Sequence, residues 1–226
     1  MTIDMTTVPH YQVWKGLRYE DINQRRSEIR VKHPGTFEWV HTSSFRQWLT
    51  SEDEPIFWII GKPGSGKSTL MISLVHSDQT LVLAHHYPQR HILSHFFSAD
   101  GGDLECNIKG LLCDLVSQLL SIPQHGIVFG FRHEVYLKEN ERDWAVAELC
   151  ALLLQLLPAF VTVCIFLDGL DEIDPTDGPP ALFDLLEKLK QYQKSKYAYQ
   201  IDLNRNFTTQ FPATLICASR TLSTTI

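Results

Sequence analysis

The stretch from Gly61 to Ser68 constrains the fold of this 226-residue chain more than any other, because it consists of Gly-Lys-Pro-Gly-Ser-Gly-Lys-Ser. This order matches the pattern Gly-x-x-x-x-Gly-Lys-Ser/Thr without a mismatch, which is typical of a phosphate-binding loop (P-loop). Small residues let the backbone curl around an anion, with its N–H groups pointing inward as donors. The apolar run 56–60 precedes the loop and a helix over 67–76 is expected after it, so both flanks fit a strand–loop–helix unit.

The loop predicts a site for a purine nucleoside triphosphate with Mg²⁺. We expect Lys67 to reach the β- and γ-phosphate oxygens, Ser68 to give its hydroxyl to Mg²⁺, and Thr69 to bond near the α-phosphate. The positive end of the following helix would face the same anion. The expected nucleotide-binding residues are Gly61, Lys62, Pro63, Gly64, Ser65, Gly66, Lys67, Ser68 and Thr69.

A second motif follows about a hundred residues later, where the apolar run 161–167 ends in Asp168. A strand that ends in an acid places a carboxylate at the C-terminal edge of a parallel sheet, where ligands bind in open α/β folds. Asp168 is therefore the expected Mg²⁺ partner, acting through water because Mg²⁺ keeps much of its hydration shell. Asp171 and Glu172 lie close enough to position the attacking water or to act as general base, and Glu172 is our first choice.

Arg220 is the third candidate, directly after an apolar strand over 213–218. A cation at the tip of a strand beside the P-loop could contact the γ-phosphate. An arginine that simply ends a strand at the surface is the other interpretation, and position alone does not choose between them.

Strands alternate with helices along most of the chain, which predicts a parallel α/β sheet. A helical N-terminal segment, residues 1–54, is expected before the nucleotide-binding core, residues 55–226. Within that segment we expect helices over 17–31 and 36–49, the second carrying an aromatic stripe for packing. An acidic link, Ser51–Pro55, follows, and residues 194–210 are polar without clear periodicity. The expected core strands are 56–60, 91–97, 161–167 and 213–218, and the expected core helices are 67–76, 107–120, 144–157 and 180–193.

Composition excludes several classes of protein. The net charge of −6 argues against nucleic acid as the main partner, since phosphate backbones select basic faces. The five cysteines form no Cys-x-x-Cys pair, which favours buried reduced thiols over disulfides or zinc.

The apolar run 149–167 is interrupted by Gln155 and Pro158, so it predicts a helix followed by a buried strand rather than a membrane span. The N-terminus lacks the features of a signal peptide, and a cytoplasmic location is expected.

Taken together, the motifs resemble the NACHT domain of fungal NLR-like STAND NTPases. In this domain a glycine follows the Mg²⁺ aspartate, and an acidic pair begins three positions beyond that aspartate, as in Asp168-Gly-Leu-Asp-Glu172. The matching segments are Gly61–Met71, Leu167–Glu172, Leu215–Arg220, Arg25–Ile29, His33–Trp39, Phe45–Leu49 and Phe96–Ser98.

The resemblance implies a nucleotide-operated switch in which ADP holds a closed state and ATP opens it into a signalling oligomer. A second copy of the chain or a full-length NLR-like protein would be the partner. It also implies a three-layer P-loop NTPase fold of the additional-strand type, with the strand before Arg220 lying between the P-loop strand and the Asp168 strand. Arg220 then becomes the expected γ-phosphate sensor. Thr221 stands where family members have proline, and the sequence ends six residues after Arg220, so the resemblance implies a truncated core.

Three other classes of function are alternatives for this sequence. A small-molecule kinase usually carries a mobile arginine-bearing lid, yet no arginine cluster follows residue 142. A GTPase switch would carry an Asn-Lys-x-Asp motif, which this sequence lacks. A non-catalytic interaction fragment of a NACHT protein is the third alternative. The main expectation is binding of ATP or GTP with Mg²⁺ and slow hydrolysis.

Overall fold

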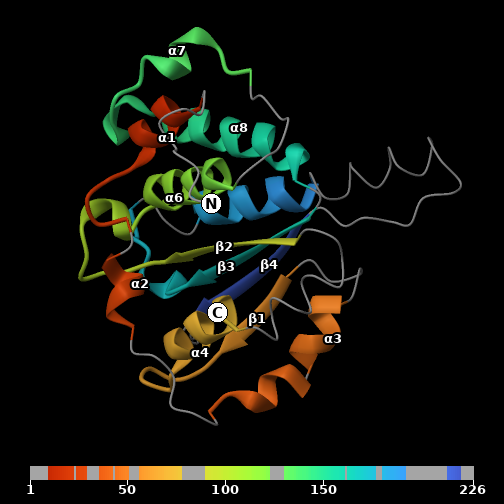
Figure 1. Ribbon diagram of the computed structural model, residues 1–226. Coiled ribbons are helices and arrows are strands. Elements are labelled where there is room, and N and C mark those ends of the chain that lie inside the picture. Colours follow the sequence, from red (N-terminus) through yellow and green to blue (C-terminus); the bar gives the residue numbers. More distant parts are fainter. Residues whose placement is uncertain are drawn as a thin grey trace, which may run out of the picture.

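The computed structural model describes residues 10–22, 24–29, 36–42, 44–50, 56–77, 90–122, 130–160, 162–176, 180–191 and 213–219. These residues form a mixed helix and strand structure around a four-stranded parallel sheet, as in an α/β fold (Figure 1). The strands are β1 (Ile56–Ile60), β2 (Arg90–Phe96), β3 (Thr162–Asp168) and β4 (Ala213–Ser219).

The strand order is β1-β4-β3-β2, so β4 lies between the P-loop strand and the Asp168 strand. This is the order that the resemblance implied. In register, Ile60 is paired with Ser219, and Phe96 with Asp168. Because the strands are parallel, these residues all lie at one edge of the sheet, and the chain that follows each strand starts there.

Helices cover both faces of the sheet (Figure 1). On one face lie α1 (Tyr11–Leu17), α6 (Ile108–Ser121), α8 (Val146–Leu156) and a helix over 180–191. On the other lie α3 (Ser44–Thr50) and α4 (Lys67–Val75). Short helical segments complete the described structure: α2 (Gln24–Glu28), α7 (His133–Tyr136) and 3₁₀ turns at Glu38–Thr42, Asp103–Glu105, Glu141–Asp143, Leu157–Ala159 and Leu170–Glu172.

Strand β3 shows why a continuous apolar run predicts a strand buried on both faces. Val163, Ile165 and Leu167 belong to the core cluster under α6 and α8. Cys164 and Phe166 point the other way, into the cluster under α4. Since successive side chains of a strand alternate in direction, both faces must be apolar when helices cover both.

The predicted helix over 17–31 is wrong. Helix α1 ends at Leu17, because Arg18 adopts an extended conformation, and only the short α2 follows. The apolar residues in this stretch are too few to give a helix a continuous buried stripe.

The predicted helix over 36–49 is also wrong, since a 3₁₀ turn at Glu38–Thr42 precedes the seven-residue α3. Its aromatic stripe serves packing only in part. Phe45 and Trp48 are buried and contact Phe57 of β1, with ring centroids 5.7 and 5.4 Å apart, whereas Trp39 is 61% exposed.

The apolar run 149–167 forms helix α8, a 3₁₀ turn that contains Pro158, and strand β3, as predicted. Among the described residues, no helix combines the length and the hydropathy that crossing a bilayer requires. Four cysteines have described side chains, and none of the four is in a disulfide. Cys113 and Cys164 are buried, as expected, while Cys106 and Cys150 are half-buried. The link 51–55, residues 194–210 and Arg220 lie outside the described residues.

Candidate functional site

The glycine-rich loop joins β1 to α4 and turns through two left-handed residues. Gly64 has φ 71° and Gly66 has φ 85°, values that favour glycine. Ser65 N–H donates to the Lys62 carbonyl at 3.2 Å, which closes the turn. Gly66 is the N-cap of α4 and has no side chain to cap it. The N–H groups of the first helical turn are thus available to an anion, at the positive end of the helix dipole.

Lys67 folds back over this loop. Its ammonium group donates to the Gly61 carbonyl at 2.7 Å and to the Lys62 carbonyl at 3.0 Å. Gly61 itself leaves little room, since a Cβ there would lie 2.8 Å from the Ser65 hydroxyl oxygen. The lysine is therefore held at the loop by backbone oxygens, on the path where phosphate oxygens would compete for its protons.

Asp168 ends β3 and is only 4% exposed. Burial raises the pKa of its carboxyl group above the ordinary value, and the negative charge of Glu172 adds to this. A hydrogen bond from the Ser68 side chain and the positive charge of Arg25 act in the opposite direction. The P-loop serine and the strand-end aspartate, which are a hundred residues apart in sequence, are thus in direct contact.

The glycine after Asp168 has a geometric cause. Gly169 has φ 73°, and a Cβ there would lie 2.8 Å from the Phe97 carbonyl oxygen. At the same point the Phe97 N–H donates to the Asp168 carbonyl at 3.0 Å, which keeps the two segments close together. The glycine of the motif is therefore required by the close approach of the chain at Phe97.

Glu172 lies in the 3₁₀ turn Leu170–Glu172, at the same end of the sheet. Its Oε2 accepts from the Ala99 N–H at 3.2 Å, and its Oε1 lies 3.9 Å from Nη2 of Arg25. The carboxylate is thus oriented by β2's following loop on one side and by α2 on the other. The sequence alone predicts no role for Arg25, which appears there only within the resembling segment Arg25–Ile29.

One cavity of about 320 Å³ brings these groups together. Its lining combines loop residues, the acids predicted from the second motif, and Arg25 from α2. The lining residues are Arg25, Gly64, Gly66, Lys67, Ser68, Thr69, Asp168, Gly169, Asp171 and Glu172. Gly61, Lys62, Pro63 and Ser65 complete the same loop.

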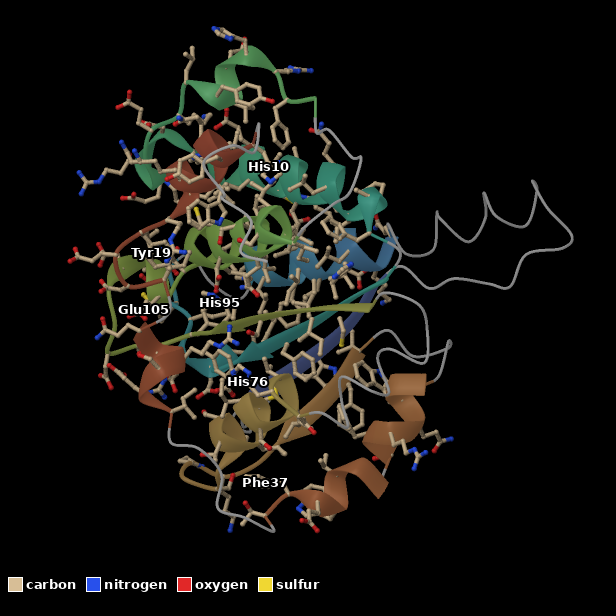
Figure 2. The ribbon with its side chains drawn as sticks, in the orientation of Figure 1. His10, Tyr19, Phe37, His76, His95 and Glu105 are labelled. Atoms are coloured by element: carbon tan, nitrogen blue, oxygen red, sulfur yellow. The ribbon has the colours of Figure 1, made fainter. Side chains whose placement is uncertain are left out.

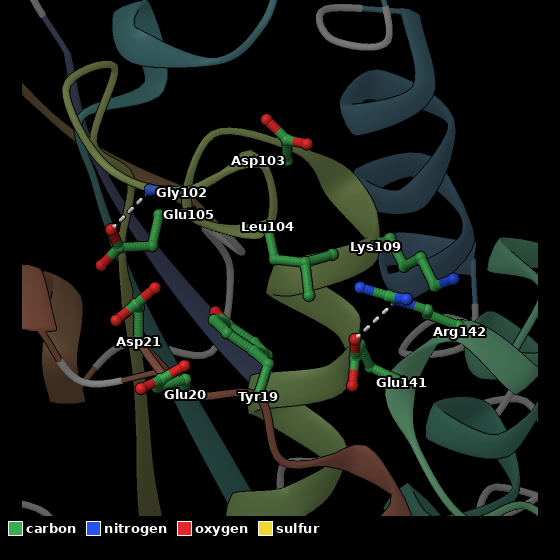
Figure 3. Close-up of a pocket in the computed structure, with 10 residues that line it drawn as sticks. All are labelled: Tyr19, Glu20, Asp21, Gly102, Asp103, Leu104, Glu105, Lys109, Glu141 and Arg142. Atoms are coloured by element: carbon green, nitrogen blue, oxygen red, sulfur yellow. Dashed lines mark hydrogen bonds and ion pairs between the residues drawn. The ribbon is translucent and has the colours of Figure 1, made fainter.

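A second cavity, of about 350 Å³, is lined by residues just before α2 and by the 3₁₀ turns at Asp103–Glu105 and Glu141–Asp143 (Figure 3). Carboxylates outnumber cations in its lining, and Figure 3 shows one of them, Glu105, bound to the Gly102 N–H at 3.1 Å. An anion would be repelled there, so size alone does not select the nucleotide site. The lining residues are Tyr19, Glu20, Asp21, Gly102, Asp103, Leu104, Glu105, Lys109, Glu141 and Arg142.

Ser68 and Asp168 fit a magnesium ion. Both present oxygen, the ligand atom that Mg²⁺ prefers, and Mg²⁺ at phosphate sites takes only one or two groups from the protein. A cation would also offset the burial that raises the pKa of Asp168. Within the described part of the chain, no group of three or more His, Cys, Asp or Glu residues is arranged to hold a metal ion.

The fold and the site define an α/β protein with a parallel sheet that carries a glycine-rich loop and a buried carboxylate at one edge. The family model described as Nephrocystin 3, N-terminal, matches residues 35–201, well over half of the chain. The chain therefore belongs to the Nephrocystin 3 N-terminal family, which is NACHT-like and NTPase-related. No curated protein and no solved structure matches it. The fungal NLR-like part of the resemblance stays a prediction.

Proposed function

We propose that this chain binds ATP or GTP with Mg²⁺, hydrolyses it slowly, and serves as the switch module of an NLR-like signalling protein. One observation carries the proposal: the hydrogen bond from the Ser68 side chain to Asp168 joins the P-loop to the strand-end acid. A glycine-rich turn that only joins a strand to a helix would not need its serine to contact an acid at the end of a distant strand. The NTPase-related family supports the same proposal.

Each group has a distinct task in this proposal. The N–H groups of the loop and of the first turn of α4 bind the phosphates, and Lys67 adds a positive charge at the β- and γ-oxygens. Mg²⁺, held by Ser68 and Asp168, would neutralise charge on the phosphates. Glu172 orients or deprotonates the attacking water, since its carboxylate lines the same cavity and is fixed by the Ala99 N–H. Asp171, which lines the same cavity, would assist it, and Arg220 remains the proposed γ-phosphate sensor.

Nucleotide binding is tested by thermal unfolding with Mg-ATP, Mg-ADP and Mg-GTP. Saturating ligand should stabilise the wild type by about 3–4 kcal/mol, because a ligand that binds only the folded state shifts unfolding by mass action. Lys67→Ala should remove this gain. Lys190→Ala is the matched control, because Lys190 is an exposed lysine paired with Glu187 on the helix over 180–191. Identical melting curves with and without nucleotide would refute the binding proposal.

Hydrolysis is tested by phosphate release from Glu172→Gln. This variant should keep the nucleotide-dependent rise in Tm and lose about 10²-fold or more in turnover, as expected when a general base is removed. Glu187→Gln, on the exposed surface of the helix over 180–191, serves as the control. Wild-type turnover in Glu172→Gln would remove Glu172 from the mechanism.

The switch itself needs a second state that the nucleotide selects. We propose that this state involves a second copy of the chain or a longer NLR-like protein in the cytoplasm, which the family resemblance supports. Size-exclusion chromatography with Mg-ATP and with Mg-ADP checks self-association, and equal elution volumes would leave only the longer partner.

A further inference from the structure

Three polar atoms near α2 are buried without a hydrogen-bond partner among the described residues: Tyr19 Oη, Arg25 Nε and His95 Nε2. They are three of the five such side-chain atoms in that part of the chain. All three residues line one small cavity of about 10 Å³. Figure 2 shows Tyr19, His95 and Glu105 gathered on the same side of the molecule. Since folded proteins leave few buried polar groups unpaired, their concentration around one cavity needs an explanation.

The size and the lining of the cavity fit a single water molecule. A bound water needs about 10–15 Å³ and two to four polar partners. This cavity has about that volume, and its lining supplies the three atoms named above. It is too small for a phosphate or an organic ligand, and too polar to stay empty as an apolar void does.

The donor and acceptor pattern around the cavity is complementary to water. His95 Nδ1 lies 2.9 Å from Asp114 Oδ2, inside the core. With the proton on Nδ1, where the carboxylate accepts it, Nε2 becomes an acceptor. Arg25 Nε can only donate, whereas the Tyr19 hydroxyl can do both. A water that accepts from Arg25 and donates to His95 uses each group in the role that its chemistry allows.

We propose that one water molecule is bound in this cavity by Tyr19 Oη, Arg25 Nε and His95 Nε2. It connects the buried pair His95–Asp114 to Arg25. Two further contacts hold Arg25: its backbone N–H donates to Glu105 at 3.2 Å, and its Nη2 lies 3.9 Å from Glu172. The water thereby positions the arginine that faces Glu172, a consequence that rests on the proposed function.

A crystal structure of the wild-type protein without nucleotide tests the site directly. We expect electron density for one water within hydrogen-bond distance of all three atoms. A cavity without such density, or three atoms that bond directly to protein groups, overturns the proposal.

Tyr19→Phe tests the same site through the sign of its effect on stability. If the hydroxyl binds water, removing it deprives that water of a partner and lowers the Tm by about 2–4 °C. If the hydroxyl is unpaired, removing it leaves the Tm unchanged or raises it, which overturns the proposal. Tyr11→Phe is the matched control, because Tyr11 lies on nearby α1, is partly exposed and keeps its ring contact with Trp14.

The claim that the water positions Arg25 opposite Glu172 is tested by a separate measurement. In a crystal structure of Tyr19→Phe we expect the Arg25 side chain to leave Glu172, and an unchanged Arg25 refutes this part. All of these measurements use protein without nucleotide. If the wild-type protein fails to bind nucleotide, the proposed function is refuted, but the test of the water site is unaffected.

Discussion

The carboxyl group of Asp168 shows how the fold and the proposed chemistry make opposite demands on one residue. Burial disfavours its charged form, yet Mg²⁺ requires that form. We expect Asp168→Asn to raise the free energy of unfolding by about 1 kcal/mol without nucleotide, since a buried charge is removed. The same variant should lose the Mg²⁺-dependent part of nucleotide stabilisation. Chemical denaturation with and without Mg-ATP measures the stability of the free protein and the stabilisation by nucleotide. An Asp168→Asn variant that is less stable than the wild type without nucleotide would contradict this prediction.

The raised pKa of Asp168 also predicts a pH dependence. The folded state holds the proton more tightly than the unfolded chain does, so this group favours folding most at a pH below its ordinary value of 3.8. That contribution is lost as the pH rises through the raised, folded-state pKa. The proposed Mg²⁺ would compete with the same proton, so its affinity for the site should increase with pH over this range. Mg²⁺ titrations in the presence of nucleotide between about pH 4 and 7 check this, with Asp168→Asn as the control that should not show the rise.

At the scale of elements, helix α6 depends on a glycine in its first turn. Asn107 caps the helix by accepting from the Gly110 N–H at 2.9 Å, and a Cβ on Gly110 would overlap the Leu104 carbonyl group. Gly110→Ala should therefore destabilise the protein by about 3 kcal/mol, although alanine is the better helix former. Urea denaturation measures this. Gly130→Ala is the control, because a Cβ there meets nothing within 4 Å; a stabilised Gly110→Ala would exclude the close contact.

The elements that could be predicted from sequence are those whose pattern is set by burial alone. Strand β3 and helix α6 carry continuous or periodic apolar residues, and the predicted bounds differ from the observed ones by one residue at each end. The N-terminal helices could not be predicted in the same way. Residues of α2 contact groups that are distant in sequence; for example, Nη2 of Arg26 lies 3.2 Å from Nε2 of His76. Local sequence patterns do not predict such contacts.

The same distinction between local patterns and distant contacts separates the residues of the candidate site that could be predicted from the one that could not. The loop, Asp168 and Glu172 were predicted because their spacing and flanking strands place them at one edge of the sheet, and the cavity does bring them together. Arg25 was missed as a participant because its partner Glu172 is 147 residues away in sequence. In the sequence, Arg25 was marked only by its place in the resembling segment Arg25–Ile29.

At the scale of the whole molecule, the sheet separates two apolar clusters. Leu153 of α8 and Leu74 of α4 are both fully buried, one in each cluster. Truncation of either to alanine should cost about 2–5 kcal/mol of stability. We expect only Leu74→Ala to weaken nucleotide binding as well, since α4 carries the P-loop at its start. Paired unfolding and binding measurements check this, and equal loss of affinity in Leu153→Ala would indicate that the two faces are coupled.

The pairing of β1 with β4 has a consequence for how the molecule is made. Among the described strands, β1 is hydrogen-bonded to β4 alone, and the paired residues Ile56 and Leu215 are separated by most of the chain. During synthesis, the pairing of β1 with β4 can therefore form only after β4 has left the ribosome. Contacts of such long sequence separation slow folding and leave strand edges exposed in the meantime. If the chain binds nucleotide as proposed, the ligand would stabilise the sheet only after β1 and β4 have paired.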